Sequence, residues 1–244
     1  MAGVSMKTVS RVVNNEPNVR PATREKVEAA ITENTQAILA THVYGNPCDV
    51  YELQKIADKH NIKLIYDAAH AFGASVDDKS LLSFGDISTC SFHATKLFHT
   101  GEGGALFAKD KTLQHQLFYS HNFGHDGPLA FHGLGINGKI SELQAAMGLA
   151  VLPHMETILA ERKRVVDFYN KNLDVTKVQI LKIRENTQWN FSYYPIIWTL
   201  FPKKFFFFRP SLLSVFFFVF RFQGLMDIGP GKGGEDKGLN SAGK

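Results

Sequence analysis

The order of hydrophobic and polar positions between residues 36 and 174 predicts short strands that alternate with helices. The expected strands are apolar runs that end at turn-forming residues: 37–40, 62–66, 87–92 and 105–108. The expected helices begin at a capping residue or a proline: 49–60, 141–152 and 153–172. Strands that alternate with helices favour a mostly parallel sheet with flanking helices, which places this part of the chain in the α/β class.

The two ends of the chain differ from this middle part. Residues 1–31 are small, polar and rich in basic side chains, whereas residues 199–244 form a Phe-rich run followed by a Gly-rich tail. Ten of the 20 phenylalanines lie between Phe201 and Phe222. The composition therefore separates a segment at 1–31, a core at 32–174 and a tail at 199–244, and a short segment at 175–198 remains between the core and the tail.

Composition and charge exclude several classes of protein. A chain of 244 residues with 44% hydrophobic residues and a net charge of +4 can bury a sizeable core, unlike a disordered or collagen-like chain. Its two cysteines, Cys48 and Cys90, predict a reduced, cytoplasmic protein, with Cys90 a small core residue. The sequence shows no signal peptide at its start, and charges and Pro210 interrupt the Phe-rich run, so we expect no membrane partner.

A carboxylate and an amine follow neighbouring strands of the expected sheet. Asp67 ends one strand, and Lys96 lies just past the end of another. Ligands of open parallel sheets bind at the carboxyl ends of the strands. The pair suits pyridoxal 5'-phosphate (PLP), because a lysine can form the Schiff base and an aspartate can bind the pyridine nitrogen. Ser91 could contact the phosphate. Spacing alone leaves an ordinary strand-end aspartate and a solvated lysine as the alternative.

Residues 36–198 resemble the DegT/StrS-type aminotransferases, which are fold-type-I PLP enzymes that aminate keto sugars on nucleotide carriers. The matching stretches are ILATHVYGNP (38–47), IYDAAHAFG (65–73), GDISTCSFHATK (85–96), GEGGAL (101–106) and GINGKISELQAAMG (135–148). The resemblance implies part of the fold-type-I large domain, followed at Phe191–Ile197 by the first strand of a small C-terminal domain.

The same resemblance implies the roles of five residues. Lys96 forms the Schiff base and transfers protons, Asp67 pairs with the pyridine nitrogen, and His70 lies beside the ring. Ser91 contacts the phosphate, and Asn137 reaches the cofactor phosphate of a neighbouring subunit in a homodimer. The implied reaction moves the amine of glutamate to a keto deoxysugar nucleotide.

Residues 2–31 resemble the helix-turn-helix of the LacI family. That resemblance implies that Met6, Lys7 and Arg11 face base edges in the major groove of DNA. The alternative function is therefore a DNA-binding transcriptional regulator fragment, with an all-α unit at the N-terminus.

Neither resemblance is complete. The aminotransferase pattern expects a long segment before the strand at residue 37, including a phosphate loop, and the LacI pattern expects a further helix before residue 2. We interpret the sequence as a truncated aminotransferase core behind a helix-turn-helix fragment, with an aberrant tail at 199–244. This interpretation leaves open whether the chain is active.

The histidines between residues 93 and 132 raise the question of a metal site. His121 and His125 have i, i+4 spacing, but glycines and a proline predict a loop around His125, so the two cannot share a helix face. We expect no metal site from the sequence. Solvated or substrate-facing loop histidines are the simpler interpretation of the set: His93, His99, His115, His121, His125 and His132.

Overall fold

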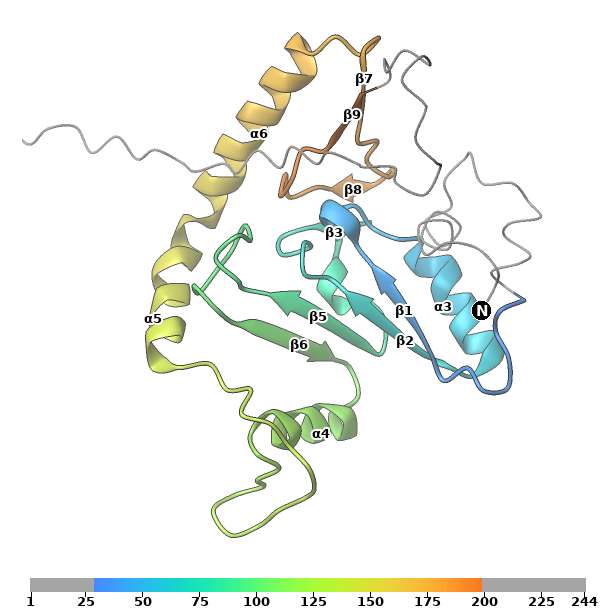
Figure 1. The fold of residues 1–244 in the computed structure, drawn as a ribbon, viewed down its shortest axis with the longest axis vertical. Helices are drawn as coiled ribbons and strands as arrows, with labels where there is room; N and C mark the ends of the chain where they lie inside the picture. The colour runs from blue at the N-terminus through green and yellow to red at the C-terminus, as the bar shows by residue number, and fades with distance from the viewer. Residues whose placement is uncertain (1–28, 199–244) are drawn as a thin grey trace, which may run out of the picture.

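A four-stranded sheet forms the centre of the fold in the computed structural model, which describes residues 29–198 (Figure 1). The strand order is β1-β2-β5-β6, with β1 at Ala37–Thr41, β2 at Lys63–Asp67, β5 at Ile87–Ser91 and β6 at Gly104–Ala108. The first three strands are parallel, and β6 is antiparallel to β5. The predicted α/β class and the mostly parallel sheet are confirmed.

Within residues 29–198, four α-helices and three short 3₁₀ helices accompany the sheet. The α-helices are α3 (Val50–His60), α4 (Lys111–His121), α5 (Glu142–Val151) and α6 (Met155–Asn172), and the 3₁₀ helices are η1 (Val43–Gly45), η2 (Leu81–Ser83) and η3 (Leu152–His154). Because η3 joins α5 to α6, the helix predicted to begin at Pro153 instead continues a long helical column along one side of the molecule (Figure 1). Helix α4 was not predicted from the sequence.

The predicted caps exist, although they differ in detail. Ser141 and Gln144 form a reciprocal capping box at the start of α5. At α3 the Asp49 carboxylate accepts the backbone N–H of Glu52. The Glu52 side chain does not return that bond, because it pairs with Lys55 on the helix surface.

Two small antiparallel sheets accompany the central sheet in the described part of the chain. One has the order β4-β3-β8, with β3 at Ser75–Val76, β4 at Lys79–Ser80 and β8 at Thr187–Gln188; the other pairs β7 (Val178–Ile180) with β9 (Ile196–Trp198). The strand expected at Phe191–Ile197 is wrong in its first half. Phe191 has a positive φ of 55°, and the N–H of Ser192 bonds to the Asn190 side chain instead of a neighbouring strand.

The main hydrophobic core packs one face of the sheet against α3. Leu64 and Tyr66 of β2 are fully buried in the same cluster as Leu53 and Ala57 of α3. The opposite face of the sheet is more open, since Leu39 of β1 is 71% exposed. A second cluster, of Leu97, Phe98 and Met155, fastens the α5–α6 column to the loop after β5.

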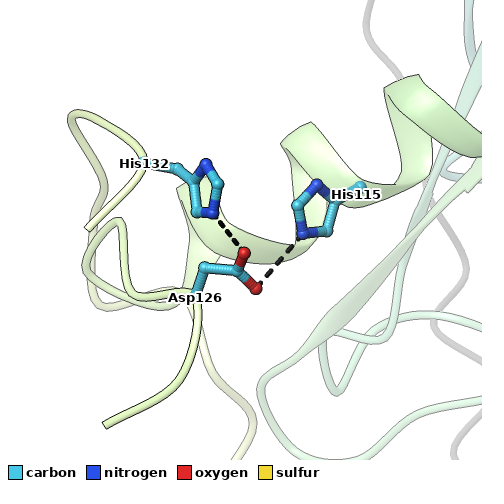
Figure 2. A group of neighbouring side chains, drawn as sticks. All are labelled: His115, Asp126 and His132. Carbon is cyan, nitrogen blue, oxygen red and sulfur yellow. Dashed lines mark hydrogen bonds and ion pairs between the residues drawn. The ribbon is translucent and has the colours of Figure 1, made fainter. Parts of the chain in front are cut away.

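Residues 122–140 project from the body between α4 and α5 (Figure 1), and we call this segment the arm. Backbone bridges between Asn122 and Asn137 and between His125 and Phe131 give it a hairpin-like course. Gly124 is required there, because a Cβ atom would lie 2.0 Å from the carbonyl oxygen of Gly133. His132 and Asp126 of the arm meet a histidine of α4 at its base (Figure 2).

Candidate cofactor site

The strand register places polar residues side by side at the carboxyl edge of the sheet. Thr41 of β1 pairs with Asp67 of β2, which pairs with Thr89 of β5. The Asp67 carboxylate accepts the backbone N–H of Ala69 at 3.1 Å, which holds it at the strand end where the chain turns. The carboxylate is only half-buried, so its other oxygen can meet a ligand.

Lys96 lies in the loop that joins β5 to β6. The buried side chains of Leu97 and Phe98 anchor this loop, since they pack in the second hydrophobic cluster. The loop backbone is closed by the bond from the Thr100 N–H to the carbonyl of Phe92 at 2.9 Å. The Lys96 Nζ atom is 5.9 Å from the centre of the Tyr193 ring, which faces the site from the C-terminal segment.

His70 follows β2 and packs beside two tyrosine rings that also contact each other. Its Nδ1 atom accepts the backbone N–H of Tyr44 at 3.2 Å, and its ring stacks on Tyr44 and contacts Tyr193 with a centroid distance of 4.7 Å. Burial lowers the pKa of His70, the positive charge of Lys96 lowers it further, and Asp67 opposes both effects. His70 is therefore neutral near pH 7, with its proton on Nε2.

The remaining predicted residues divide between the sheet edge and the arm. Ser91 ends β5, and its Oγ atom accepts the backbone N–H of His93 at 3.3 Å. Cys90 points into the protein, and burial raises the pKa of its thiol to about 11, which fits an unreactive core residue. Asn137 is exposed and lies on the arm, which projects beyond α4, away from the carboxyl ends of β2 and β5 (Figure 1).

Three residues that the sequence analysis did not select brace the His70 loop. Asn190 is fully buried, and its amide donates to the carbonyl oxygens of His70 and Phe72, both at 2.8 Å. The hydroxyl of Ser192 donates to the same His70 carbonyl, and Arg162 of α6 donates to the carbonyl of Ser192 at 3.0 Å. No periodic signal marks these residues, because each acts through a contact with a distant part of the chain.

Gly45 allows the loop after β1 to pass directly against this brace. Its φ is +75°, and a Cβ atom there would lie 2.4 Å from Asn190 Oδ1 and 2.9 Å from the carbonyl oxygen of His70. Only glycine combines this backbone conformation with so close an approach.

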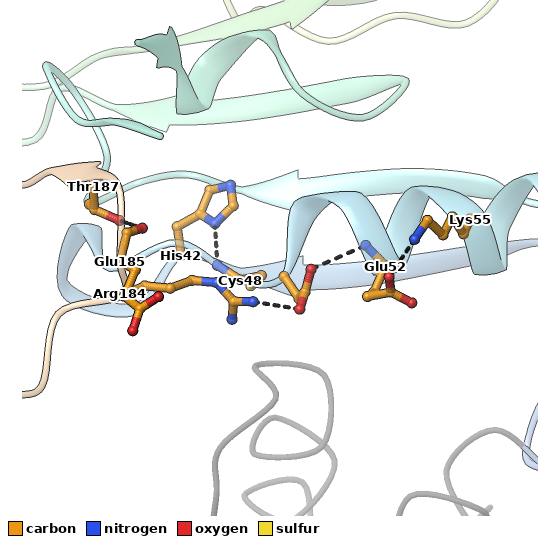
Figure 3. A network of polar contacts seen from close by, with 8 residues as sticks. His42, Cys48, Glu52, Lys55, Arg184, Glu185 and Thr187 are labelled. Carbon is orange, nitrogen blue, oxygen red and sulfur yellow. Dashed lines mark hydrogen bonds and ion pairs between the residues drawn. The ribbon is translucent and has the colours of Figure 1, made fainter. Parts of the chain in front are cut away.

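A second network of polar contacts holds the loop between β1 and α3 in place (Figure 3). Arg184 forms an ion pair with Asp49, the residue that caps α3. The buried His42 accepts the backbone N–H of Cys48 at 3.1 Å through Nδ1, and burial lowers the pKa of His42 to about 4. The segment around β8 is therefore tied to the start of α3 as well as to the His70 loop.

The donor set at the sheet edge fits PLP. It offers a carboxylate for the pyridine nitrogen, a primary amine for the aldehyde carbon and a hydroxyl for the phosphate, together with a neutral imidazole beside them. An α/β fold with a mostly parallel sheet and this edge defines a class of protein: the PLP-dependent aminotransferases of fold type I, of which the described residues form part.

The chain belongs to the DegT/DnrJ/EryC1/StrS aminotransferase family, whose model matches residues 5–205. Enzymes of this family depend on PLP. A dTDP-4-amino-4,6-dideoxy-D-glucose transaminase of Shigella dysenteriae is 46% identical over 173 residues, which cover 70% of this chain and 47% of the relative. A GDP-perosamine synthase of Escherichia coli O157:H7 is 36% identical over 162 residues, which cover 64% and 43%.

Solved structures agree with this assignment. The structure of DesI with its TDP-sugar product is 36% identical and superposes with a TM-score of 0.65, covering 70% of this chain and 44% of that one. A PLP-form structure from Streptococcus pneumoniae, 23% identical with a TM-score of 0.67, covers 72% of this chain and 51% of that one and shares the fold. The chain spans about half the length of the relatives it matches.

The LacI resemblance gains no support from these comparisons. The family model begins at residue 5, so it includes most of the segment that we compared with a helix-turn-helix. Met6, Lys7 and Arg11 lie outside the described residues, and so does the tail at 199–244.

Proposed function

We propose that the protein transfers an amino group from glutamate to the keto group of a nucleotide-linked deoxysugar. The observation that carries the proposal is the meeting of Asp67, His70 and Lys96 at one edge of the sheet, where both charged groups act on the pKa of the imidazole. The printed activities of the relatives, on dTDP- and GDP-linked sugars, support the substrate class.

Each residue has a distinct task in this proposal. PLP, when bound, supplies an electron sink for the carbon that carries the amino group. The Asp67 carboxylate would hold the proton of the pyridine nitrogen, and Lys96 Nζ would attach the cofactor and then carry a proton between substrate and cofactor carbons. The hydroxyl of Ser91 would bind the phosphate, and the His70 ring would lie beside the cofactor.

Borohydride reduction followed by peptide mapping tests the proposal. The full chain is incubated with PLP and reduced, and we expect the reduced adduct on Lys96. The adduct should be absent in Lys96→Arg and retained in Lys63→Arg, a matched control at the opposite end of β2, where Lys63 pairs with Asp86 at the surface. A folded chain that carries no adduct on Lys96, or carries it equally on other lysines, would contradict the proposal.

We further propose that a second copy of this chain is the protein partner. The arm and α5 expose large apolar side chains, such as Leu134 at 97%, Leu143 at 85% and Leu149 at 72%. Monomeric proteins rarely expose so much apolar surface in one region. A second copy would cover it, and Asn137 on the arm would then be placed to reach a neighbouring cofactor. Analytical ultracentrifugation should show a dimer, and a monomer at micromolar concentration would contradict this.

The long helical column also passes a simple test for a membrane span. By length and hydropathy alone, Glu142–Asn172 could cross a bilayer. In the structure Gly148 of this column packs against Thr100 and Phe98, since a Cβ atom there would lie 2.9 Å from Thr100 Cγ2. Helices of soluble proteins can have the same length and hydropathy. We propose that the exposed apolar side chains of this column contact the second copy of the chain in the cytoplasm.

A further inference from the structure

Two histidines and an aspartate converge at the base of the arm, outside the candidate cofactor site. His115 belongs to α4, whereas Asp126 and His132 belong to the arm (Figure 2). His115 Nε2 lies 3.2 Å from Asp126 Oδ1, and His132 Nε2 contacts the other oxygen of the same carboxylate. Within residues 29–198, this is the one group of at least three such side chains whose ligand atoms all lie within 4.8 Å of one another.

The backbone fixes both arm residues before any ion binds. The Asp126 N–H donates to the carbonyl of Ala130 at 3.0 Å, and the His132 N–H donates to the carbonyl of Gly124 at 2.9 Å. The His132 ring also stacks on Tyr119 of α4, with a centroid distance of 5.3 Å. The three ligands therefore come from two hydrogen-bonded segments that already hold them close together, which lowers the entropic cost of gathering them around an ion.

We propose that His115, Asp126 and His132 bind a zinc-like divalent ion that clips the arm to α4. Two imidazole nitrogens and one carboxylate form a ligand set that Zn²⁺ accepts, whereas Mg²⁺ and Ca²⁺ prefer oxygen ligands alone. Bonds of about 2.0–2.2 Å in a tetrahedron place the ligand atoms roughly 3.4 Å apart. Atoms already within 4.8 Å of one another need to move by only about 1 Å to reach that spacing.

The three side chains of the cluster are accessible to solvent. His115 is 49% exposed, His132 is 44% exposed and Asp126 is 35% exposed, so solvent reaches the cluster directly. A water molecule can therefore take the fourth position, as in sites with three protein ligands. Binding of the ion would replace the present contacts of the two imidazoles with the carboxylate by bonds to the metal.

The site differs from the one that the sequence pattern brought to attention. His121 ends α4, and its Nδ1 is bonded to the carbonyl of Leu117 at 3.0 Å. His125 lies past the end of that helix, and its ring contacts Phe131 with a centroid distance of 4.4 Å. Neither belongs to the cluster, which makes His125 a matched control: it is the same residue type in the same arm.

Zinc titration of the full chain by calorimetry, after removal of any affinity tag and without PLP, tests the proposal. We expect one Zn²⁺ per chain, and at least tenfold weaker binding in His115→Asn and His132→Asn. Binding to His125→Asn should stay within about twofold of the parent. Far-UV circular dichroism of each variant confirms that it is folded.

Titration with Co²⁺ gives an independent readout, because a four-coordinate ion produces visible absorption bands that a hydrated ion on the surface lacks. The bands should appear in the parent and in His125→Asn, and should be lost in His132→Asn. Absence of binding to the parent would overturn the proposal, as would equal binding by His132→Asn. Neither experiment measures amino transfer, so the result is independent of the proposed enzyme activity.

Discussion

Replacing Asn190 by alanine should destabilise the fold more than any exposed substitution in the same segment. Asn190 is fully buried, and its side chain makes three hydrogen bonds: two to the carbonyls of His70 and Phe72, and one from the N–H of Ser192. After truncation the His70 carbonyl keeps the hydroxyl of Ser192, but the Phe72 carbonyl and the Ser192 N–H lose this partner.

The expected loss in the free energy of unfolding follows from these two groups, which no longer have their hydrogen-bond partner. A buried polar group that loses its partner costs about 1–3 kcal/mol, and the Phe72 carbonyl belongs at the low end because it is only part-buried. We therefore expect the free energy of unfolding to fall by roughly 2–4 kcal/mol. With a urea dependence of about 2 kcal/mol/M, the midpoint should move by about 1–2 M.

Urea unfolding of the PLP-free chain, followed by circular dichroism, measures this shift without interference from cofactor binding. Asn190→Asp retains the volume but removes the amide donors, so it should be at least as destabilising. Gln188→Ala is the control, because the Gln188 side chain donates to the exposed Asp78 and its loss should change stability by less than about 0.5 kcal/mol. If Asn190→Ala unfolds at the same midpoint as Gln188→Ala, the brace does not stabilise the fold and the reasoning fails.

Three further outcomes follow from the surrounding networks. Gly45→Ala should cost about 2 kcal/mol or more in a urea melt, because alanine is strained at a φ of +75° and its methyl group overlaps neighbouring atoms; an unchanged midpoint would contradict the close approach. Arg184→Met should lower the free energy of unfolding by about 1–2 kcal/mol, because the mostly buried Asp49 loses its ion pair. Arg164→Met removes an exposed ion pair and should lower it by less than about 0.5 kcal/mol, and equal losses in the two variants would contradict this prediction. Burial lowers the pKa of His42 from 6.5 in the unfolded chain to about 4 in the fold, so the unfolded chain binds more protons between these pH values. The free energy of unfolding should therefore fall by about 3 kcal/mol as the pH drops from 6.5 to 4. His42→Gln should flatten the dependence of unfolding free energy on pH in that window, and an unaltered slope would exclude His42 as its source.

Local patterns predicted the sheet and the main polar groups at its edge. The apolar runs that became β1, β2 and β5 are short and end at turn residues, and the Ser141 cap is readable from two positions three residues apart. Asp67 and Lys96 could be predicted to lie close together because parallel strands end at a common edge. Their roles toward PLP came from the family resemblance, and these roles stay predictions.

Contacts between distant parts of the chain could not be predicted in the same way. The brace from Asn190 to His70 spans 120 residues, and a single buried asparagine has no periodicity to reveal it. The two-residue strands β3 and β8 are too short to leave a pattern. The proposed metal-binding cluster was not predicted, because the i, i+4 spacing in the sequence pointed to His121 and His125. His115 and His132 lie close together only because the arm folds back on α4.

The late position of Asn190 and Ser192 in the sequence also has a consequence for synthesis on the ribosome. Strand β2, which carries Asp67, and the loop after β5, which carries Lys96, emerge long before these two residues, which supply hydrogen bonds to a carbonyl 120 and 122 residues earlier. Because domains emerge and fold from the N-terminal side, the sheet edge can form while the His70 loop still lacks its brace. A nascent chain should therefore acquire its full affinity for the cofactor only after Ser192 has left the exit tunnel.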